Sequence, residues 1–230
     1  MTAPVRPRVV VVGGGFAGAW CARHLARRGG EAVEVVLLDR RNHLLFYPLL
    51  VEAGTGSLEP RHTVVPLRSL IDRARFVMAE VLEADPRART LRFRVPGEET
   101  PRSLDFDHLV VCPGSVTRLP PVPGLPEHAF LMKSLHDAVT LRDRAIELLE
   151  RAAVTEDAAR RRRLLHWVVV GGSFTGVEVA GEFLEVLRRG ARRYPELDEA
   201  EVRITLVEMA DRLLPAFDES LARYAADHLR

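Results

Sequence analysis

The sequence predicts an α/β protein that contains one strand–turn–helix–strand unit twice. The first copy starts at residues 9–18, where four valines precede a run of glycines. The second copy starts at residues 167–176 and repeats the valines, the phenylalanine and most of the glycines of the first. In both copies the helix is followed by an apolar strand that ends at an acidic residue. This pattern is typical of two Rossmann-like dinucleotide-binding units.

The glycines of the first copy have the spacing of a turn that holds a pyrophosphate. Gly13 permits the tight turn, Gly15 lets the backbone approach the phosphates, and Gly18 lets the helix pack closely on the strand. The anion would lie at the helix N-terminus, whose first turn contains Phe16 and Ala17. Residues 35–38 predict the next strand. Asp39 at its end is placed to accept the hydroxyls of a ribose.

The second copy differs from the first at one position of its turn. Ser173 stands between Gly171 and Gly176 in place of the middle glycine; its Cβ would crowd a pyrophosphate, and its hydroxyl could donate to one. Residues 202–207 predict a strand that ends in Glu208, an acid that repels a 2′-phosphate and so favours NADH over NADPH. Only two strands of this second sheet are predicted, so the second unit is incomplete. The alternative, glycine turns that merely pack helices on sheets, fits a single copy better than two.

Composition excludes several classes of protein. The chain has 230 residues, of which 47% are hydrophobic, and a net charge of +1, which gives no reason to expect a nucleic-acid partner. Cys21 and Cys112 lie far apart and in no C-x-x-C motif, so we expect no disulfide framework and a cytoplasmic location. The first residues lack the apolar core of a signal peptide, and no apolar run approaches the roughly 20 residues of a membrane span. No metal site is predicted.

The segments between the two copies predict the domain boundary. Residues 75–84 alternate partly, which predicts a strand, residues 90–95 return as its hairpin partner, and residues 106–111 form a further strand. The proline-rich stretch 118–126 then separates a first domain, residues 1–120, from a second domain, residues 121–230. A helix begins near Ser134, a suitable N-cap.

With these motifs, the chain resembles the flavoprotein oxidoreductases that bind two dinucleotides, and within them the type II NADH dehydrogenases, which are NADH:quinone oxidoreductases. The resemblance rests on both glycine turns, on the Asn-x-x-x-Phe-x-Pro-Leu-Leu run from Asn42 and on the strand that leads to Cys112-Pro113-Gly114. It implies the FAD/NAD(P)-binding fold, with FAD in the first domain and NAD(P)H in the second.

The resemblance also implies roles for single residues. Glu178, in a Gly-Val-Glu run just after the second turn, would lie near nicotinamide and flavin and act in hydride transfer or quinone access; the alternative is an acid stabilised by the helix N-terminus. The cofactor-binding residues beyond the first turn and Asp39 would be Arg40, Pro48, Val81, Cys112 and Gly114. Those of the second domain would be Gly171, Ser173, Thr175, Gly176 and Glu208.

The implied activity is hydride transfer from NADH to FAD, followed by electron transfer to an acceptor, which the resemblance indicates is a quinone. Two alternatives remain: a related flavin reductase with another acceptor, and a fragment that binds nucleotide without being an enzyme. The sequence has no Gly-Asp pair, with which the family closes its FAD site, and no C-terminal membrane anchor. We therefore expect the N-terminal portion of a longer protein. The complete protein would lie on the inner face of a membrane, and a homodimer is compatible with the family.

Overall fold

The computed structural model describes residues 6–229, which fall into two compact units. The first unit consists of the chain up to Phe46 and of Arg61–Arg118, and the second of Tyr47–Pro60 and Leu119–Arg230. The break after Arg118 lies beside the expected boundary at residue 120. The expected first domain differs from the observed first unit because residues 47–60 group with the second unit, where Val51 packs into its hydrophobic core. The expected limits at residues 1 and 230 lie outside the described residues.

The first unit is built on a four-stranded parallel sheet with the order β5-β2-β1-β9. Its strands are β1 (Arg8–Val12), β2 (Glu34–Asp39), β5 (Arg75–Met78) and β9 (His108–Val111). The other elements are α1 (Phe16–Gly29), η1 (Gly30–Ala32), β3 (His43–Leu45), η3 (Pro60–Thr63), β4 (Val64–Pro66), α3 (Leu67–Leu70), β6 (Glu80–Asp85), β7 (Thr90–Arg94) and β8 (Arg102–Asp105).

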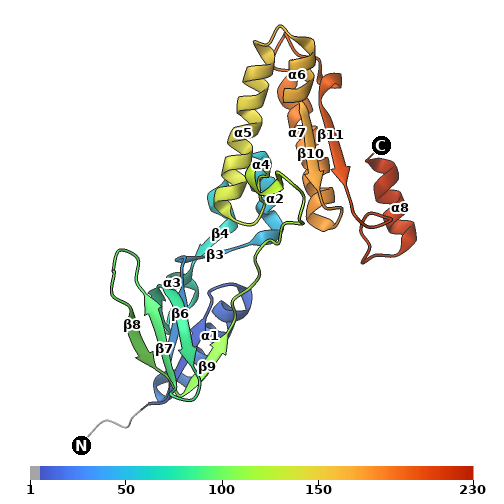
Figure 1. The fold of residues 1–230 in the computed structure, drawn as a ribbon. Coiled ribbons are helices and arrows are strands. Elements are labelled where there is room, and N and C mark those ends of the chain that lie inside the picture. Colours follow the sequence, from blue (N-terminus) through green and yellow to red (C-terminus); the bar gives the residue numbers. More distant parts are fainter. Residues whose placement is uncertain (1–5, 230) are drawn as a thin grey trace, which may run out of the picture. The chain divides into compact units, whose positions relative to one another are not determined.

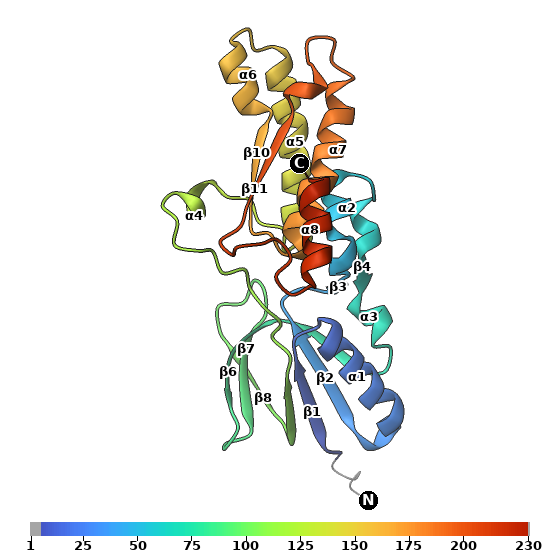
Figure 2. The same ribbon diagram turned by 90° about the vertical axis from the view of Figure 1, so that its right-hand side faces the viewer.

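Both faces of this parallel sheet are covered, as Figure 2 shows. Helix α1 packs on one face through Ala19, Ala22 and Ala26, all of which are buried. The antiparallel sheet β6-β7-β8 packs on the other face through Leu91 and Phe93. Strands covered on both faces must be apolar throughout, which explains the unbroken valine run of β1.

One predicted strand is in fact two. Residues 75–84 divide into β5, which pairs with β2, and β6, which pairs with β7 in the antiparallel sheet. The division falls at Ala79, which is buried and donates its N–H to the carbonyl of Asp39 at 2.9 Å. The alternation of Phe76 and Met78 breaks at Glu80, so the pattern changes close to the point where the chain leaves one sheet for the other.

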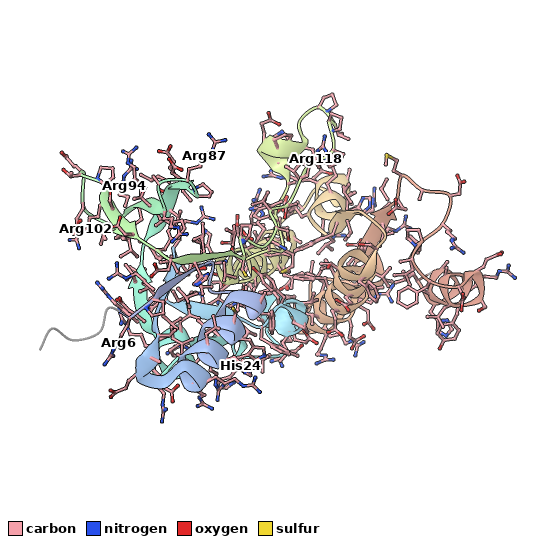
Figure 3. The ribbon with its side chains drawn as sticks, turned by 90° about the horizontal axis from the view of Figure 1, so that it is seen from below. Arg6, His24, Arg87, Arg94, Arg102 and Arg118 are labelled. Atoms are coloured by element: carbon pink, nitrogen blue, oxygen red, sulfur yellow. The ribbon has the colours of Figure 1, made fainter. Side chains whose placement is uncertain are left out.

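The outer face of the antiparallel sheet is polar. Arg92 and Arg94 of β7 are exposed and alternate with the buried Leu91 and Phe93. In Figure 3 the labelled side chains of Arg87, Arg94 and Arg102 project outward from this sheet. The alternation therefore gives a solvated face, as a half-buried antiparallel sheet requires.

The second unit contains a two-stranded parallel sheet of β10 (His166–Val170) and β11 (Arg203–Val207). Helices α5 (Leu135–Ala153) and α7 (Phe174–Ala191) run side by side in Figure 1, with α2 (Leu50–Thr55) against them. Their buried faces form one core with the inner face of the sheet. The remaining elements are η2 (Tyr47–Leu49), α4 (Leu125–His128), α6 (Ala158–Leu164), η4 (Glu199–Glu201) and α8 (Glu219–His228).

Two sequence predictions for this unit are confirmed. Ser134 caps α5: its Oγ accepts the N–H of Asp137 at 3.1 Å, and the Asp137 carboxylate accepts the N–H of Ser134 at 2.8 Å. The sheet has the two expected strands, and its outer face leaves Val168, Val170 and Val207 exposed. In residues 6–229, no helix is long and apolar enough to cross a membrane.

Candidate functional site

The first glycine turn connects β1 to α1. At two of its positions only glycine fits. Gly13 has a φ of 100°, and a Cβ on it would lie 2.0 Å from the carbonyl oxygen of Cys112. A Cβ on Gly18 would lie 1.8 Å from the carbonyl oxygen of Gly13. Both approaches are to backbone atoms, which cannot move aside without disrupting the turn. Gly13 therefore makes the tight turn, and Gly18 lets the helix pack closely against it.

The N-terminus of α1 is open and suited to an anion. Gly15 is the N-cap, and a Cβ built on it would meet nothing within 4 Å. No side chain caps this helix, and its first turn contains no acidic residue. Phe16 and Ala17 are exposed in that turn. Unsatisfied N–H groups at an uncapped N-terminus favour a phosphate, so the residues present fit the pyrophosphate of a dinucleotide.

Asp39 has a structural role that the sequence did not reveal. Its Oδ2 accepts the N–H of Gly14 at 2.6 Å, and its Oδ1 accepts the N–H of Arg41 at 2.7 Å. Each carboxylate oxygen has two lone pairs, so both can still accept a ribose hydroxyl. The carboxylate therefore holds the glycine turn against the end of β2 and remains available to a ligand. Arg40, next to it, is exposed.

Three other predicted residues of the first unit lie around this turn. The N–H of Cys112 donates to the carbonyl of Val12 at 2.8 Å, which brings Cys112 against Gly13. Gly114 follows with a φ of 72° and is exposed. Val81, partly buried on β6, lies two residues beyond the Ala79 contact to Asp39. The topology thus gathers these residues at the carboxyl ends of the parallel strands, where open α/β sheets bind ligands.

Pro48 belongs to the other unit. It is exposed in η2, which belongs to the second unit. Its neighbour Tyr47 has its ring 5.0 Å from the ammonium of Lys133, a cation–π contact within the same unit. The contacts of the helix that follows Pro48 group this segment with the second unit, and the role of Pro48 in cofactor binding stays a prediction.

The second glycine turn repeats the geometry of the first. Gly171 has a φ of 108°, and a Cβ on Gly176 would lie 1.7 Å from the carbonyl oxygen of Gly171. Ser173 is the N-cap of α7 with φ −83° and ψ −168°, beside −72° and −168° for Gly15. The serine therefore fits without backbone strain, and its side chain makes no capping hydrogen bond. Thr175 is exposed in the first turn of α7.

Glu208 takes the place of Asp39 in this repeat. Its Oε2 accepts the N–H of Gly172 at 2.5 Å, and its Oε1 accepts the N–H of Ala210 at 2.8 Å. The N–H donors of Ala210 and Gly172 hold the pKa of the Glu208 carboxyl below its ordinary value of 4.5. A depressed pKa stabilises the folded state above that ordinary value, and the stabilisation is lost as the pH falls through the pKa of the folded protein.

We therefore predict that Glu208→Gln destabilises the protein at pH 7 and that the destabilisation shrinks as the pH falls towards 3. Urea unfolding followed by circular dichroism measures the difference from the wild type at each pH. The control is Glu196→Gln, which replaces an exposed glutamate with no hydrogen bond among the described residues. A loss of stability in Glu208→Gln that is the same at every pH would contradict the lowered pKa of the Glu208 carboxyl.

Glu178 lines a pocket of the second unit with a volume of about 230 Å³. The pocket lies between α2 and α7 and is lined by Val51, Glu52, Val177, Glu178, Gly181 and Glu182. Burial, and then the nearby carboxylate of Glu52, raise the pKa of Glu178 above its ordinary value. Sequence reasoning missed Glu52. The sequence marks Glu52 in one way: it is the carboxylate of α2, a helix whose other residues are apolar or small.

The sequence profile of the family described as pyridine nucleotide-disulphide oxidoreductase matches residues 7–230. An external alternative NADH-ubiquinone oxidoreductase of Yarrowia lipolytica mitochondria is 33% identical over 96% of this chain and 39% of its own length. An external alternative NAD(P)H-ubiquinone oxidoreductase, B2, of Arabidopsis thaliana mitochondria is 31% identical over 98% of the chain and 40% of its own length. The chain thus spans about 40% of the length of these curated relatives.

Among solved structures, NDH2 of Plasmodium falciparum in complex with NADH superposes with a TM-score of 0.89. It covers 97% of this chain and 46% of its own, at 21% sequence identity. The sulfide:quinone oxidoreductase of Aquifex aeolicus superposes with a TM-score of 0.70 at 18% identity. At these identities the superpositions establish the fold: an α/β fold with two Rossmann-like units.

Proposed function

Because the chain belongs to the pyridine nucleotide-disulphide oxidoreductase family, we propose that the protein is an FAD-dependent NADH dehydrogenase that delivers electrons to a quinone. The observation that carries this proposal is the duplicated turn. Two uncapped helix N-termini follow two glycines with positive φ, and each turn is held by an acid at the end of the next strand. Two such turns suit an enzyme that holds two dinucleotides at once. The names of the curated relatives support NADH and ubiquinone as the substrates.

We assign FAD to the first turn. Its pyrophosphate would meet the backbone at the N-terminus of α1, and Asp39 would accept hydroxyls of the adenosine ribose. The residues of the first unit that would hold FAD are Gly13, Gly15, Phe16, Ala17, Gly18, Asp39, Arg40, Val81, Cys112 and Gly114, and a role for Pro48 stays a prediction. When bound, FAD supplies the hydride acceptor for NADH and the electron donor for the quinone.

We assign NADH to the second turn. The open N-terminus of α7 would receive its pyrophosphate, with the free hydroxyl of Ser173 and the exposed Thr175 beside it. Glu208 would accept the ribose hydroxyls and repel a 2′-phosphate, which favours NADH. Glu178, one helical turn further along α7, is the residue proposed to act near the reacting groups. The residues that would hold NADH are Gly171, Ser173, Thr175, Gly176 and Glu208.

A quinone acceptor has a consequence for location. Long-chain quinones reside in the bilayer, so we propose that the complete protein meets its acceptor at a membrane surface, as a peripheral protein. A homodimer stays a prediction.

The proposal is tested by visible spectroscopy of the FAD-loaded protein under anaerobic conditions. We expect NADH to bleach the flavin band and a short-chain quinone to restore it. Bleaching that ferredoxin or another carrier reverses, and quinone does not, would indicate the related reductase with another acceptor. A protein that retains no FAD would contradict the proposal and favour a nucleotide-binding fragment without enzymatic activity.

A further inference from the structure

The loop that joins β11 to α8, residues 208–218, contacts the second glycine turn. Glu208 at its start accepts the N–H of Gly172, and Leu214 further along donates its own N–H to the carbonyl of Gly172 at 2.8 Å. The side chain of Leu213 also lies close, because a Cβ on Gly172 would be 2.5 Å from its Cδ2. One loop therefore holds Gly172 by both its N–H and its carbonyl group, directly before the N-cap of α7.

Leu214 makes this contact in a conformation that leucine rarely adopts. Its φ is 49°, and Arg89 is the one other described residue besides the glycines with a positive φ. A residue with a Cβ is crowded in this left-handed region, so the conformation persists only where the surrounding structure holds it. Bonds elsewhere in the loop must therefore offset the unfavourable backbone of Leu214.

Arg212 supplies those bonds. Its Nη2 donates to the carbonyl oxygens of Pro215 at 3.1 Å and of Phe217 at 3.0 Å. The N–H of Phe217 donates in turn to the carbonyl of Leu214 at 2.9 Å. The guanidinium lies before Leu214 in the chain and binds the residues after it, so it closes the loop around Leu214. Because the donor is charged, these bonds are stronger than those between neutral groups.

The same bonds place Phe217 against the start of α7. Its ring packs edge-on against that of Phe174, the first residue of the helix, with the ring centroids 4.7 Å apart. The N-terminus of α7 is where the proposed function places the pyrophosphate of NADH. Through Leu214 and Phe217, Arg212 is thereby linked to the residues on either side of Ser173.

An arginine beside the ribose acid has a second conceivable role. In dinucleotide-binding units such an arginine accommodates the 2′-phosphate of NADP. Arg212 lies four residues after Glu208, but Nη2 directs its hydrogens to two carbonyl oxygens of its own loop. Turning the guanidinium towards a phosphate would break both bonds and leave Leu214 without its support.

We propose that Arg212 is a positioning residue of the second dinucleotide site, where it holds the loop on Gly172 and does not serve as a ligand for a 2′-phosphate. The inference rests on the proposed function for the identity of the nucleotide. It assigns the preference for NADH to the carboxylate of Glu208 alone. Loss of Arg212 would then weaken the binding of both nucleotides equally, because each needs the turn at Gly172 in place.

The test is calorimetric titration of the FAD-loaded protein with NAD⁺ and with NADP⁺, neither of which reduces the flavin. Arg212→Met removes the donors and keeps an unbranched side chain. We expect it to lower the affinities for NAD⁺ and NADP⁺ by the same factor, about tenfold, and to leave the affinity for FAD unchanged. An unchanged affinity for NAD⁺, or a loss confined to NADP⁺, would overturn the proposal.

Arg223→Met is the matched control. It replaces an exposed arginine of α8 that pairs with Glu219 on the same helix. We expect this variant to bind NAD⁺ and NADP⁺ like the wild type. A loss as large as that in Arg212→Met would mean that removing any arginine of this region weakens binding, and it would overturn the role given to Arg212.

Hydrogen exchange of the Leu214 amide guards against a general folding defect and needs no nucleotide. We expect Arg212→Met to accelerate this exchange by about tenfold, because the bond to Gly172 opens more often, while the amides of β10 and β11 exchange as before. Equal exchange of Leu214 in both proteins, or faster exchange throughout the unit, would overturn the proposal. A wild-type protein that binds neither nucleotide would overturn the proposed function, and the exchange result alone would then decide whether Arg212 holds the loop.

Discussion

Replacing Gly18 by alanine is expected to lower the free energy of unfolding by about 3 kcal/mol, because the added methyl group would lie 1.8 Å from the carbonyl oxygen of Gly13. Relief requires α1 to move away from β1, and that movement would open the packing of Ala19 and Ala22 on the sheet. The loss should exceed the helix-propensity gain of about 1 kcal/mol that alanine normally has over glycine. Urea unfolding monitored by circular dichroism measures the change.

Gly181→Ala is the matched control for this experiment. Gly181 also lies inside a helix, α7, but a Cβ built on it would meet nothing within 4 Å. We expect this variant to be as stable as the wild type or more stable by up to about 1 kcal/mol. Similar losses in both variants would mean that the close approach at Gly18 is not what requires glycine there.

Gly15→Val is expected to lower the affinity for FAD by about two orders of magnitude, or about 3 kcal/mol, while leaving the fold intact. The backbone of Gly15 is extended and its Cβ position is open, so valine can be accommodated in the absence of a ligand. The branched side chain would then occupy the space that a pyrophosphate needs at the N-terminus of α1. Flavin fluorescence during titration of the apoprotein measures the affinity.

The second turn provides the control. Ser173→Val places the same branched side chain at the equivalent N-cap, whose backbone dihedral angles nearly match those of Gly15. We expect Ser173→Val to weaken NADH binding and to retain FAD. Gly15→Val should weaken FAD binding and retain the binding of NADH. Loss of the same ligand in both variants would contradict the assignment of the two turns.

The sequence was informative wherever one local segment determines both structure and chemistry. Each glycine turn has its strand, its helix and its acid within about 40 residues, so spacing alone located Gly13, Gly171, Asp39 and Glu208. The predicted resemblance to type II NADH dehydrogenases, made on these segments, is confirmed by the curated relatives and by the family match.

The remaining features depend on tertiary packing and were not predictable from local patterns. Residues 47–60 join the second unit because α2 packs against α5 and α7, and nothing in their own sequence specifies those partners. The bonds from Gly14 and Gly172 to the acids depend on how each turn meets the next strand. The relation of Glu52 to Glu178 joins helices more than 100 residues apart in the chain, and no spacing rule connects them.

The central claim is that two separate turns hold two different dinucleotides at the same time. An equilibrium titration of the protein with FAD, followed by NAD⁺, which does not reduce the flavin, tests it most directly. The account predicts that one FAD and one NAD⁺ bind per chain, and that saturation with FAD leaves the second site available. Competition of the two dinucleotides for a single site would contradict it.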